Sequence, residues 1–159
     1  MKARPVAREM LSAVGEDLKL ALEELRELAR GLHPAVLTDR GLAPALQSLA
    51  TRAPFQVKVA GVPHGRLAEA VEAAVYYVVA ESLTNAAKHS GASEARVGLS
   101  ASDDTVTLEI RDNGSGGANL AAGSGIRGLA DRVEALGGRL ELESSVGAGT
   151  VVRAALPLS

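Results

Sequence analysis

The segment from Leu67 to Ser90 most restricts what this chain can fold into, because it predicts a long helix that is apolar almost all the way round. A surface helix is apolar along one stripe only, whereas a helix that is apolar on every side is buried. Four of its polar residues recur at intervals that place them in a single stripe at about 100° per residue. The stripe consists of Glu81, Asn85, Lys88 and His89.

This polar stripe has two interpretations. It is an ordinary solvent face near a helix end, or it faces a ligand cavity. Burying a carboxylate, an amide and an ammonium group without partners costs roughly several kcal/mol. An Asn and a carboxylate offer oxygen ligands that suit Mg²⁺, and a Lys suits phosphate. The second interpretation therefore predicts a binding site along this helix.

The remaining chain predicts an α+β fold, because antiparallel strand pairs lie between helices and no βαβ winding is visible. The predicted elements are helices over 6–32 and 41–51, a strand over 55–60, the helix over 67–90, strands over 95–101 and 105–111, a helix over 126–136, and strands over 139–144 and 150–156. Thr38 or Asp39 is expected to cap the second helix. His64 lies in a predicted turn and is interpreted as a surface loop residue.

The first predicted helix is too long to be covered by a small domain alone, at about 40 Å for 1.5 Å per residue. It packs on its own domain, or it belongs to a two-helix hairpin or dimer bundle of which part is missing.

Ten of the 17 glycines lie between Gly114 and Gly149. The segment from Gly123 to Leu129 leads into a helix, where glycine amides and the helix dipole favour phosphate. It also matches G-x-G-x-x-G, but no strand comes immediately before it, which argues against a dinucleotide fold. Asp112 ends a predicted strand beside a glycine-rich loop and is a good acceptor for an exocyclic amine.

Composition excludes several classes of function. A net charge of −2 and only three aromatic residues argue against a nucleic-acid surface. The absence of Cys removes disulfides, thiolate metal sites and Cys nucleophiles. No apolar run reaches the roughly 18 residues of a membrane span, and no signal peptide is visible. We therefore expect a cytoplasmic location and no membrane contact for this fragment, and no direct contact with nucleic acid. The sequence leaves open whether the parent protein is tethered to a membrane.

Four motifs together resemble, in order and spacing, the ATP-binding catalytic domain of sensor histidine kinases, a member of the GHKL superfamily that includes gyrase-type and mismatch-repair ATPases. They are an N box over Glu81–His89, a first glycine box over Asp112–Gly116, a second over Gly123–Gly138 and a final one over Gly147–Thr150. The resemblance covers about residue 37 to the C-terminus. It implies a Bergerat-type two-layer α/β sandwich: a mixed, mainly antiparallel sheet, with helices on one face and the nucleotide between them.

The resemblance also implies roles for individual residues and two cofactors, ATP and Mg²⁺. Asn85 would coordinate Mg²⁺, and Lys88 and His89 would contact phosphate oxygens. Asp112 would accept the adenine amine with support from Thr150.

The glycine boxes are expected to complete the ATP site. Gly114 and Gly116 would begin a short lid, and Gly123 and Gly125 would offer amides to the phosphates. The second box also contributes Ile126, Gly128 and Leu129. Glu81 is the catalytic candidate. Its counterpart in the ATPases activates water, whereas in the kinases the base for transfer to His is usually placed beside the phosphoacceptor. Glu81 would then only orient water and metal in this chain.

A narrower resemblance extends upstream, to the kinases paired with nitrate-regulator-like response regulators. Residues 25–34, L-R-E-L-A-R-G-L-H-P, look like the end of their dimerisation domain. By this resemblance residues 1–33 are the second helix of a dimerisation hairpin, and residues 34–159 are the catalytic domain. The phosphoacceptor His is expected on a missing upstream helix, and His33 is interpreted as a junction residue. The chain should thus bind ATP without phosphorylating itself.

The implied whole protein is a homodimeric protein-histidine kinase. Its implied partner is a response regulator with a receiver domain and a DNA-binding output domain.

Two other functions use the same residues. One is a stand-alone ATPase or an anti-sigma-type protein-serine kinase, against which the long first helix argues. The other is a degenerate nucleotide-sensing module, against which the intact Asn85, Asp112 and glycine boxes argue.

Overall fold

The computed structural model describes residues 14, 15, 18, 34–119 and 124–158. The chain divides into two units, Met1–His33 and Pro34–Ser159. The helix predicted over 6–32 lies almost wholly outside the described residues, as do His33 and Gly123. The assignment of residues 1–33 to a dimerisation hairpin therefore stays a prediction.

The second unit contains both helices and strands. The helices are α2 (Ala35–Arg40), α3 (Leu42–Arg52), α4 (Glu69–Asn85), the π-helical turn η1 (Ala86–Ser90) and α5 (Ser124–Ala135). The strands are β1 (Gln56–Ala60), β2 (Glu94–Ala101), β3 (Thr105–Asp112), β4 (Arg139–Ser144) and β5 (Thr150–Pro157).

The five strands form one mixed sheet in the order β1-β2-β3-β5-β4. The pair β1–β2 is parallel, and the other three pairs are antiparallel. The α+β class and the mixed, mainly antiparallel sheet predicted from the sequence are confirmed.

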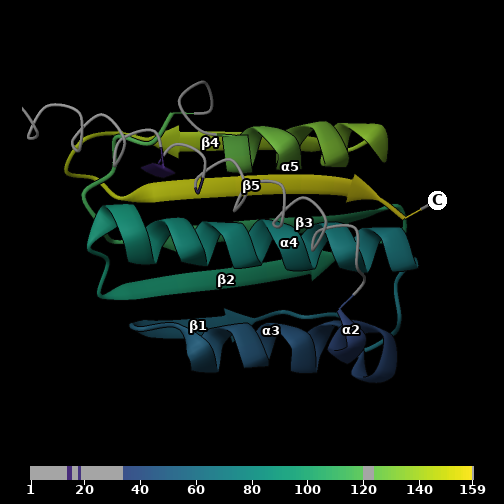
Figure 1. Cartoon of the computed structure of the whole chain (residues 1–159). Coiled ribbons are helices and arrows are strands. Elements are labelled where there is room, and N and C mark those ends of the chain that lie inside the picture. Colours follow the sequence, from purple (N-terminus) through teal and green to yellow (C-terminus); the bar gives the residue numbers. More distant parts are fainter. Residues whose placement is uncertain (1–13, 16–17, 19–33, 120–123, 159) are drawn as a thin grey trace, which may run out of the picture. The chain divides into compact units, whose positions relative to one another are not determined.

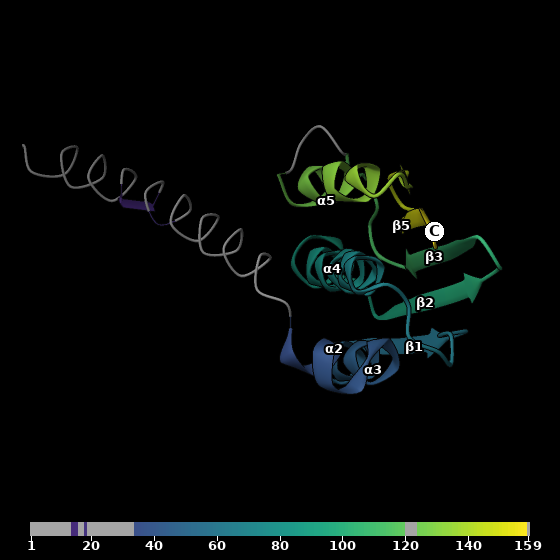
Figure 2. The same cartoon turned by 90° about the vertical axis from the view of Figure 1, so that its right-hand side faces the viewer.

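The unit has two layers, with the helices on one face of the sheet (Figures 1 and 2). Helix α4 runs along the middle of this face, between α3 and α5. Alternate residues of the strands point into the layer between sheet and helices, as the period of two requires. The core is aliphatic, and its fully buried members include Leu37, Leu46, Val75, Val79, Val97, Val106, Leu108, Val133 and Leu156.

Helix α4 is buried on most of its circumference, as its composition predicts. The structure shows one buried charge that was not predicted from the sequence. Glu72 is completely buried and accepts hydrogen bonds from the Arg66 guanidinium at 2.9–3.2 Å and from the Leu67 amide at 3.0 Å. Arg66 also donates to the carbonyl oxygens of Leu37 and Thr38. This ion pair ties the C-terminal end of α2 to the start of α4.

The predicted cap of the second helix is wrong. Thr38 and Asp39 lie inside the short helix α2, which begins after Pro34. Gly41 then separates α2 from α3, and no side chain caps α3. A φ of +82° at Gly41 explains the break, because a residue with a Cβ is strained there. The turn residue His64 is exposed, as expected.

The predicted helix over 67–90 changes its hydrogen-bond pattern near its end. It is α-helical through Asn85 and π-helical from Ala86 to Ser90, and Gly91 ends it in the left-handed conformation. In a π turn each hydrogen bond spans five residues rather than four, so side chains advance by a smaller angle. The single stripe predicted from 100° per residue therefore does not extend to Lys88, an exposed residue outside the cavity lining described below.

Candidate functional site

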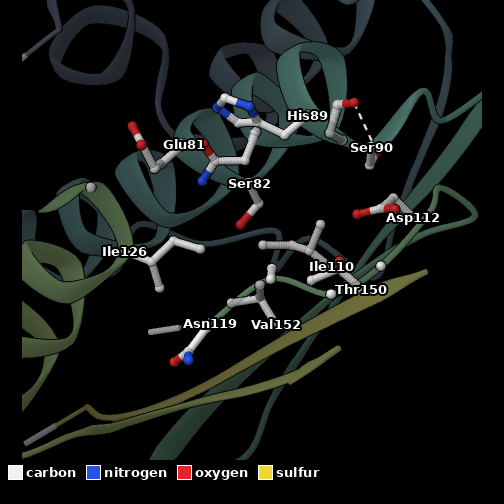
Figure 3. A pocket seen from close by; sticks show the side chains of 16 residues that line it. Glu81, Ser82, His89, Ser90, Ile110, Asp112, Asn119, Ile126, Thr150 and Val152 are labelled. Atoms are coloured by element: carbon white, nitrogen blue, oxygen red, sulfur yellow. Dashed lines mark hydrogen bonds between the residues drawn. The ribbon is translucent and has the colours of Figure 1, made fainter. Parts of the chain in front are cut away.

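A cavity of about 420 Å³ lies between α4, η1, the start of α5 and the carboxyl-terminal part of β3. This volume is in the range of small-molecule binding sites. Helix residues form one wall, and residues of β3 and β5 form the opposite one (Figure 3). The lining consists of Glu81, Ser82, Asn85, Ala86, His89, Ser90, Ile110, Asp112, Gly116, Gly117, Ala118, Asn119, Gly125, Ile126, Thr150 and Val152.

The sheet wall is apolar in its middle and polar at its end. Ile110 and Val152 are direct partners in the β3–β5 pairing, and Asp112 and Thr150 are partners two residues further along. Because alternate strand residues share a face, all four point toward the helices. This row offers a flat apolar ligand a surface that ends in two hydrogen-bonding groups.

Asp112 is held in one orientation. Its side chain is largely buried, and its Oδ1 accepts a 2.8 Å hydrogen bond from the amide of Gly114. Among the described residues, no hydrogen bond reaches its Oδ2. A buried carboxylate needs donors for both oxygens. Asp112 is therefore preorganised to accept a further N–H group from a ligand.

The loop after Asp112 is attached to its surroundings by short hydrogen bonds. Asn113 Oδ1 accepts from the amides of Ser93 and Glu94, at 3.0 Å each. The Ser115 amide donates to the Ser90 carbonyl at 2.8 Å, and the Gly147 amide donates to the Ser115 carbonyl at 2.6 Å. The first glycine box thus bridges η1 and the β4–β5 turn.

Several glycines of this region lie where no side chain fits, among them Gly149 and Gly114. A Cβ on Gly149 would overlap the carbonyl oxygen of Asp112, and one on Gly114 would overlap Ser90. Gly149 also has a φ of +74°. The glycines are therefore required by close backbone packing at the end of β3, a reason that the sequence alone does not show.

The helix wall carries the polar groups of the predicted N box. Glu81, Asn85 and His89 all line the cavity, and they come from successive turns of α4 and η1. Glu81 packs directly against Gly125 at the start of α5, where a Cβ would overlap its Oε1. The carboxylate therefore lies at the N-terminal end of α5, where backbone N–H groups are available to anions.

The structure brings together eight of the predicted site residues. Those that line the cavity are Glu81, Asn85, His89, Asp112, Gly116, Gly125, Ile126 and Thr150. Four others lie outside its lining: Lys88, Gly114, Gly128 and Leu129. Leu129 is a core residue, because it is 2% exposed. The structure does not test the role of any of these residues, and each role stays a prediction.

Part of the lining was not predicted from the sequence. Ile110 and Val152 could have been found from the strand alternation that ends at Asp112. Ser82, Ser90 and Asn119 carry no sequence signal of their own. No group of three or more His, Cys, Asp or Glu side chains in the described part of the chain could hold a metal ion. None of the helices in that part is long and apolar enough to cross a membrane.

The arrangement suits a ligand with a flat ring at one end and anionic groups at the other. The ring would lie on Ile110 and Val152 with an amine toward Asp112. The anionic groups would lie toward Asn85, His89 and the first turn of α5. An adenine nucleotide has this distribution of groups.

Comparison with known proteins agrees with this geometry. Residues 70–159 match the family model described as histidine kinase-, DNA gyrase B- and HSP90-like ATPase. The sensor histidine kinase MctS of Rhizobium johnstonii is 34% identical over 156 residues, covering 91% of this chain and 33% of the relative. The sensor histidine kinase NarS of Mycobacterium tuberculosis is 37% identical over 150 residues, covering 89% of this chain and 35% of the relative. The chain thus spans about a third of the length of these relatives.

Solved structures show the same fold. The histidine kinase domain of the blue-light activated kinase of Erythrobacter litoralis EL346 superposes with a TM-score of 0.57 at 25% identity, covering 73% of this chain and 57% of that one. The ATP binding domain of PrrB from Mycobacterium tuberculosis gives 0.55 at 26% identity, covering 74% of this chain and 91% of that one. The chain therefore belongs to the family of histidine kinase-, DNA gyrase B- and HSP90-like ATPases, as an ATP-binding catalytic domain of the sensor histidine kinase type.

Proposed function

We propose that this chain binds ATP together with Mg²⁺ in the cavity between α4 and the sheet. In a longer protein it would present the γ-phosphate to a histidine on an upstream helix. The observation that carries the proposal is the half-satisfied carboxylate of Asp112 at the end of an apolar wall. It supports recognition of an exocyclic amine such as that of adenine.

The helix wall supports a phosphate site. Asn85 and His89 line the cavity, and α5 begins at Ser124, close to Glu81. The N–H groups of a helix's first turn and the positive end of its dipole favour phosphate. Lys88 lies in the same π turn as His89 and would reach phosphate from outside the cavity.

The oxygen atoms of Asn85 and Glu81 fit Mg²⁺ better than a metal ion that needs several protein ligands. Mg²⁺ keeps several waters and is commonly held by one or two protein oxygens together with substrate phosphates. Asn85 and Glu81 supply oxygen atoms on one side of the cavity, and no larger ligand cluster occurs among the described residues. Bound there, the ion would neutralise phosphate charge. Asn85 would hold it, and Glu81 would orient its water.

Phosphoryl transfer needs mainly positioning and charge neutralisation. The residues described here would bind the nucleotide and orient the γ-phosphate for in-line attack by the imidazole of a separate helix. A response regulator would then receive the phosphoryl group. The homodimer, the DNA-binding output of that regulator and a cytoplasmic location complete the proposal.

Isothermal titration calorimetry with ATP, in the presence and absence of Mg²⁺, tests the binding step. Incubation with γ-labelled ATP tests the phosphotransfer assignment. We expect binding that Mg²⁺ strengthens, and no stable acid-labile phosphate on this chain. Acid-labile phosphate retained on the chain would contradict the assignment. Steady ATP hydrolysis abolished by Glu81→Ala would favour the stand-alone ATPase instead.

A further inference from the structure

The base-binding end of the cavity continues into a third strand. Asp112 of β3 pairs with Thr150 of β5, and Thr150 pairs with Ser144 of β4. Direct partners in antiparallel strands point to the same face of a sheet. Ser144 is therefore the last member of a polar row that runs from the cavity wall to the sheet edge, although it is not part of the cavity lining itself.

The hydroxyl of Ser144 has three hydrogen-bonding neighbours. The Ala118 amide donates to its Oγ at 3.0 Å, the Gly149 carbonyl oxygen lies 3.3 Å away, and Oγ1 of Thr150 lies 2.9 Å away. A serine hydroxyl can donate once and accept twice. The Ala118 amide can only donate, and the Gly149 carbonyl can only accept.

One arrangement satisfies all three contacts. Ser144 accepts from Ala118, donates to the Gly149 carbonyl, and accepts from the Thr150 hydroxyl. The hydrogen of Thr150 then points away from the cavity, and Oγ1 offers only lone pairs to a ligand. Beside it, the Asp112 carboxylate also only accepts.

We propose that Ser144 is a positioning residue for base selectivity, which holds Thr150 as a hydrogen-bond acceptor. This inference rests on the proposed ATP site. Asp112 and Thr150 would then present two acceptors side by side at the end of the cavity. Such an end favours a purine with an amine at position 6 and disfavours one with a carbonyl there, because the carbonyl would meet oxygen lone pairs.

Removal of the Ser144 hydroxyl would allow Thr150 to act as a hydrogen-bond donor toward the ligand instead of an acceptor. Without Ser144 Oγ as an acceptor, the Thr150 hydroxyl is free to turn its hydrogen into the cavity. It could then donate to a carbonyl oxygen of the ligand.

The test is the ratio of the dissociation constants of ITP and ATP, measured by calorimetry with Mg²⁺ on the whole chain. ITP has a carbonyl at position 6 where ATP has the amine, and its N1 carries a hydrogen where N1 of ATP has a lone pair; the rest of the two nucleotides is the same. We expect Ser144→Ala to lower this ratio by about five- to tenfold, which is the size of one hydrogen bond. Ser144→Thr keeps a hydroxyl and should keep the ratio. Any loosening of the bond to Ala118 acts on both nucleotides alike and cancels in the ratio.

A double-mutant cycle separates positioning from a general structural effect. Thr150→Val removes the hydroxyl that Ser144 is proposed to hold, so Ser144→Ala should leave the ratio unchanged in that background. A folded Ser144→Ala variant with the wild-type ratio would overturn the inference, as would an effect that persists with Val at position 150. A wild-type chain that binds ATP and ITP equally well would also overturn it, while leaving the proposed function intact. A chain that binds neither nucleotide would refute the proposed function.

Discussion

The amide of Gly114 donates a 2.8 Å hydrogen bond to Oδ1 of Asp112, two residues before it. Because this bond occupies Oδ1, Oδ2 is the carboxylate oxygen that is open to a ligand. The bond also requires that the atom at the Oδ1 position be an acceptor, because a backbone N–H can only donate. The glycine box therefore orients the residue that is proposed to read the base.

Asp112→Ala should weaken ATP binding by roughly tenfold to a hundredfold, as expected for a hydrogen bond to a charged group. Asp112→Asn is more informative. The Gly114 amide would keep the asparagine oxygen at the Oδ1 position, so the amide NH₂ would face the ligand. We expect weaker ATP binding and a shift of preference toward ITP, measured by calorimetry. An Asn variant that binds ATP as tightly as wild type would contradict this orientation.

Gly149→Ala should disrupt the end of the sheet, because the new Cβ would overlap the carbonyl oxygen of Asp112 and occupy a left-handed conformation. The left-handed conformation alone costs about 1–2 kcal/mol. We expect thermal denaturation to show a loss of at least that size, together with a loss of ATP binding. Gly65→Ala is the matched control, because nothing lies within 4 Å of its Cβ position. Equal stability of the two variants would refute the packing account.

Removing Arg66 and removing Glu72 from their ion pair should lower the free energy of unfolding by different amounts. Arg66→Ala leaves a fully buried carboxylate without its cation, whereas Glu72→Gln leaves a guanidinium whose side chain is 55% exposed to water. Stranding a buried charge costs about 3–5 kcal/mol. We therefore expect Arg66→Ala to lower the free energy of unfolding by about this much, and Glu72→Gln by less. Urea denaturation compares them, and the reverse order would show that the buried carboxylate is not the costly group.

Glu94, at the start of β2, should titrate below the usual range of a glutamate. A hydrogen bond from Arg96 and the charge of Lys58 hold the pKa of Glu94 below its ordinary value. Since the folded-state pKa is lowered, its contribution to stability is present above the unfolded pKa and is lost as the pH falls through the folded one. Arg96→Gln should raise the pKa of Glu94 toward its ordinary value in an NMR titration. An unchanged pKa would mean that Arg96 does not hold the carboxylate in solution.

Most of the fold could be predicted from local patterns. The alternation of Val106, Leu108 and Ile110 marks the buried face of β3, and the observed strand has this pattern. The apolar composition of the segment over 67–90 predicted the central buried helix. These predictions succeeded because they depend on periodicity, which neighbouring residues determine by themselves.

Predictions that depended on hydrogen bonds at helix ends were less accurate. Thr38 and Asp39 were expected to cap a helix, but the positive φ of Gly41 divides the segment into two helices. Lys88 was expected in the stripe with Glu81, but the π turn after Asn85 changes the angle between residues. When backbone hydrogen bonds change from spanning four residues to spanning five, the amino-acid sequence gives no clear indication of it.

The sequence by itself determined the fold class, the central helix and the four motifs that point to an ATP-binding site, because each depends on the order and spacing of residues along the chain. The tertiary structure alone decided which of those residues share a cavity, that Glu72 is a buried ion-pair partner, and that Ser144 lies beside Thr150. The reason is strand pairing and packing: the row of Asp112, Thr150 and Ser144 joins residues from three strands. Their hydrogen bonds depend on a sheet register that no single segment contains.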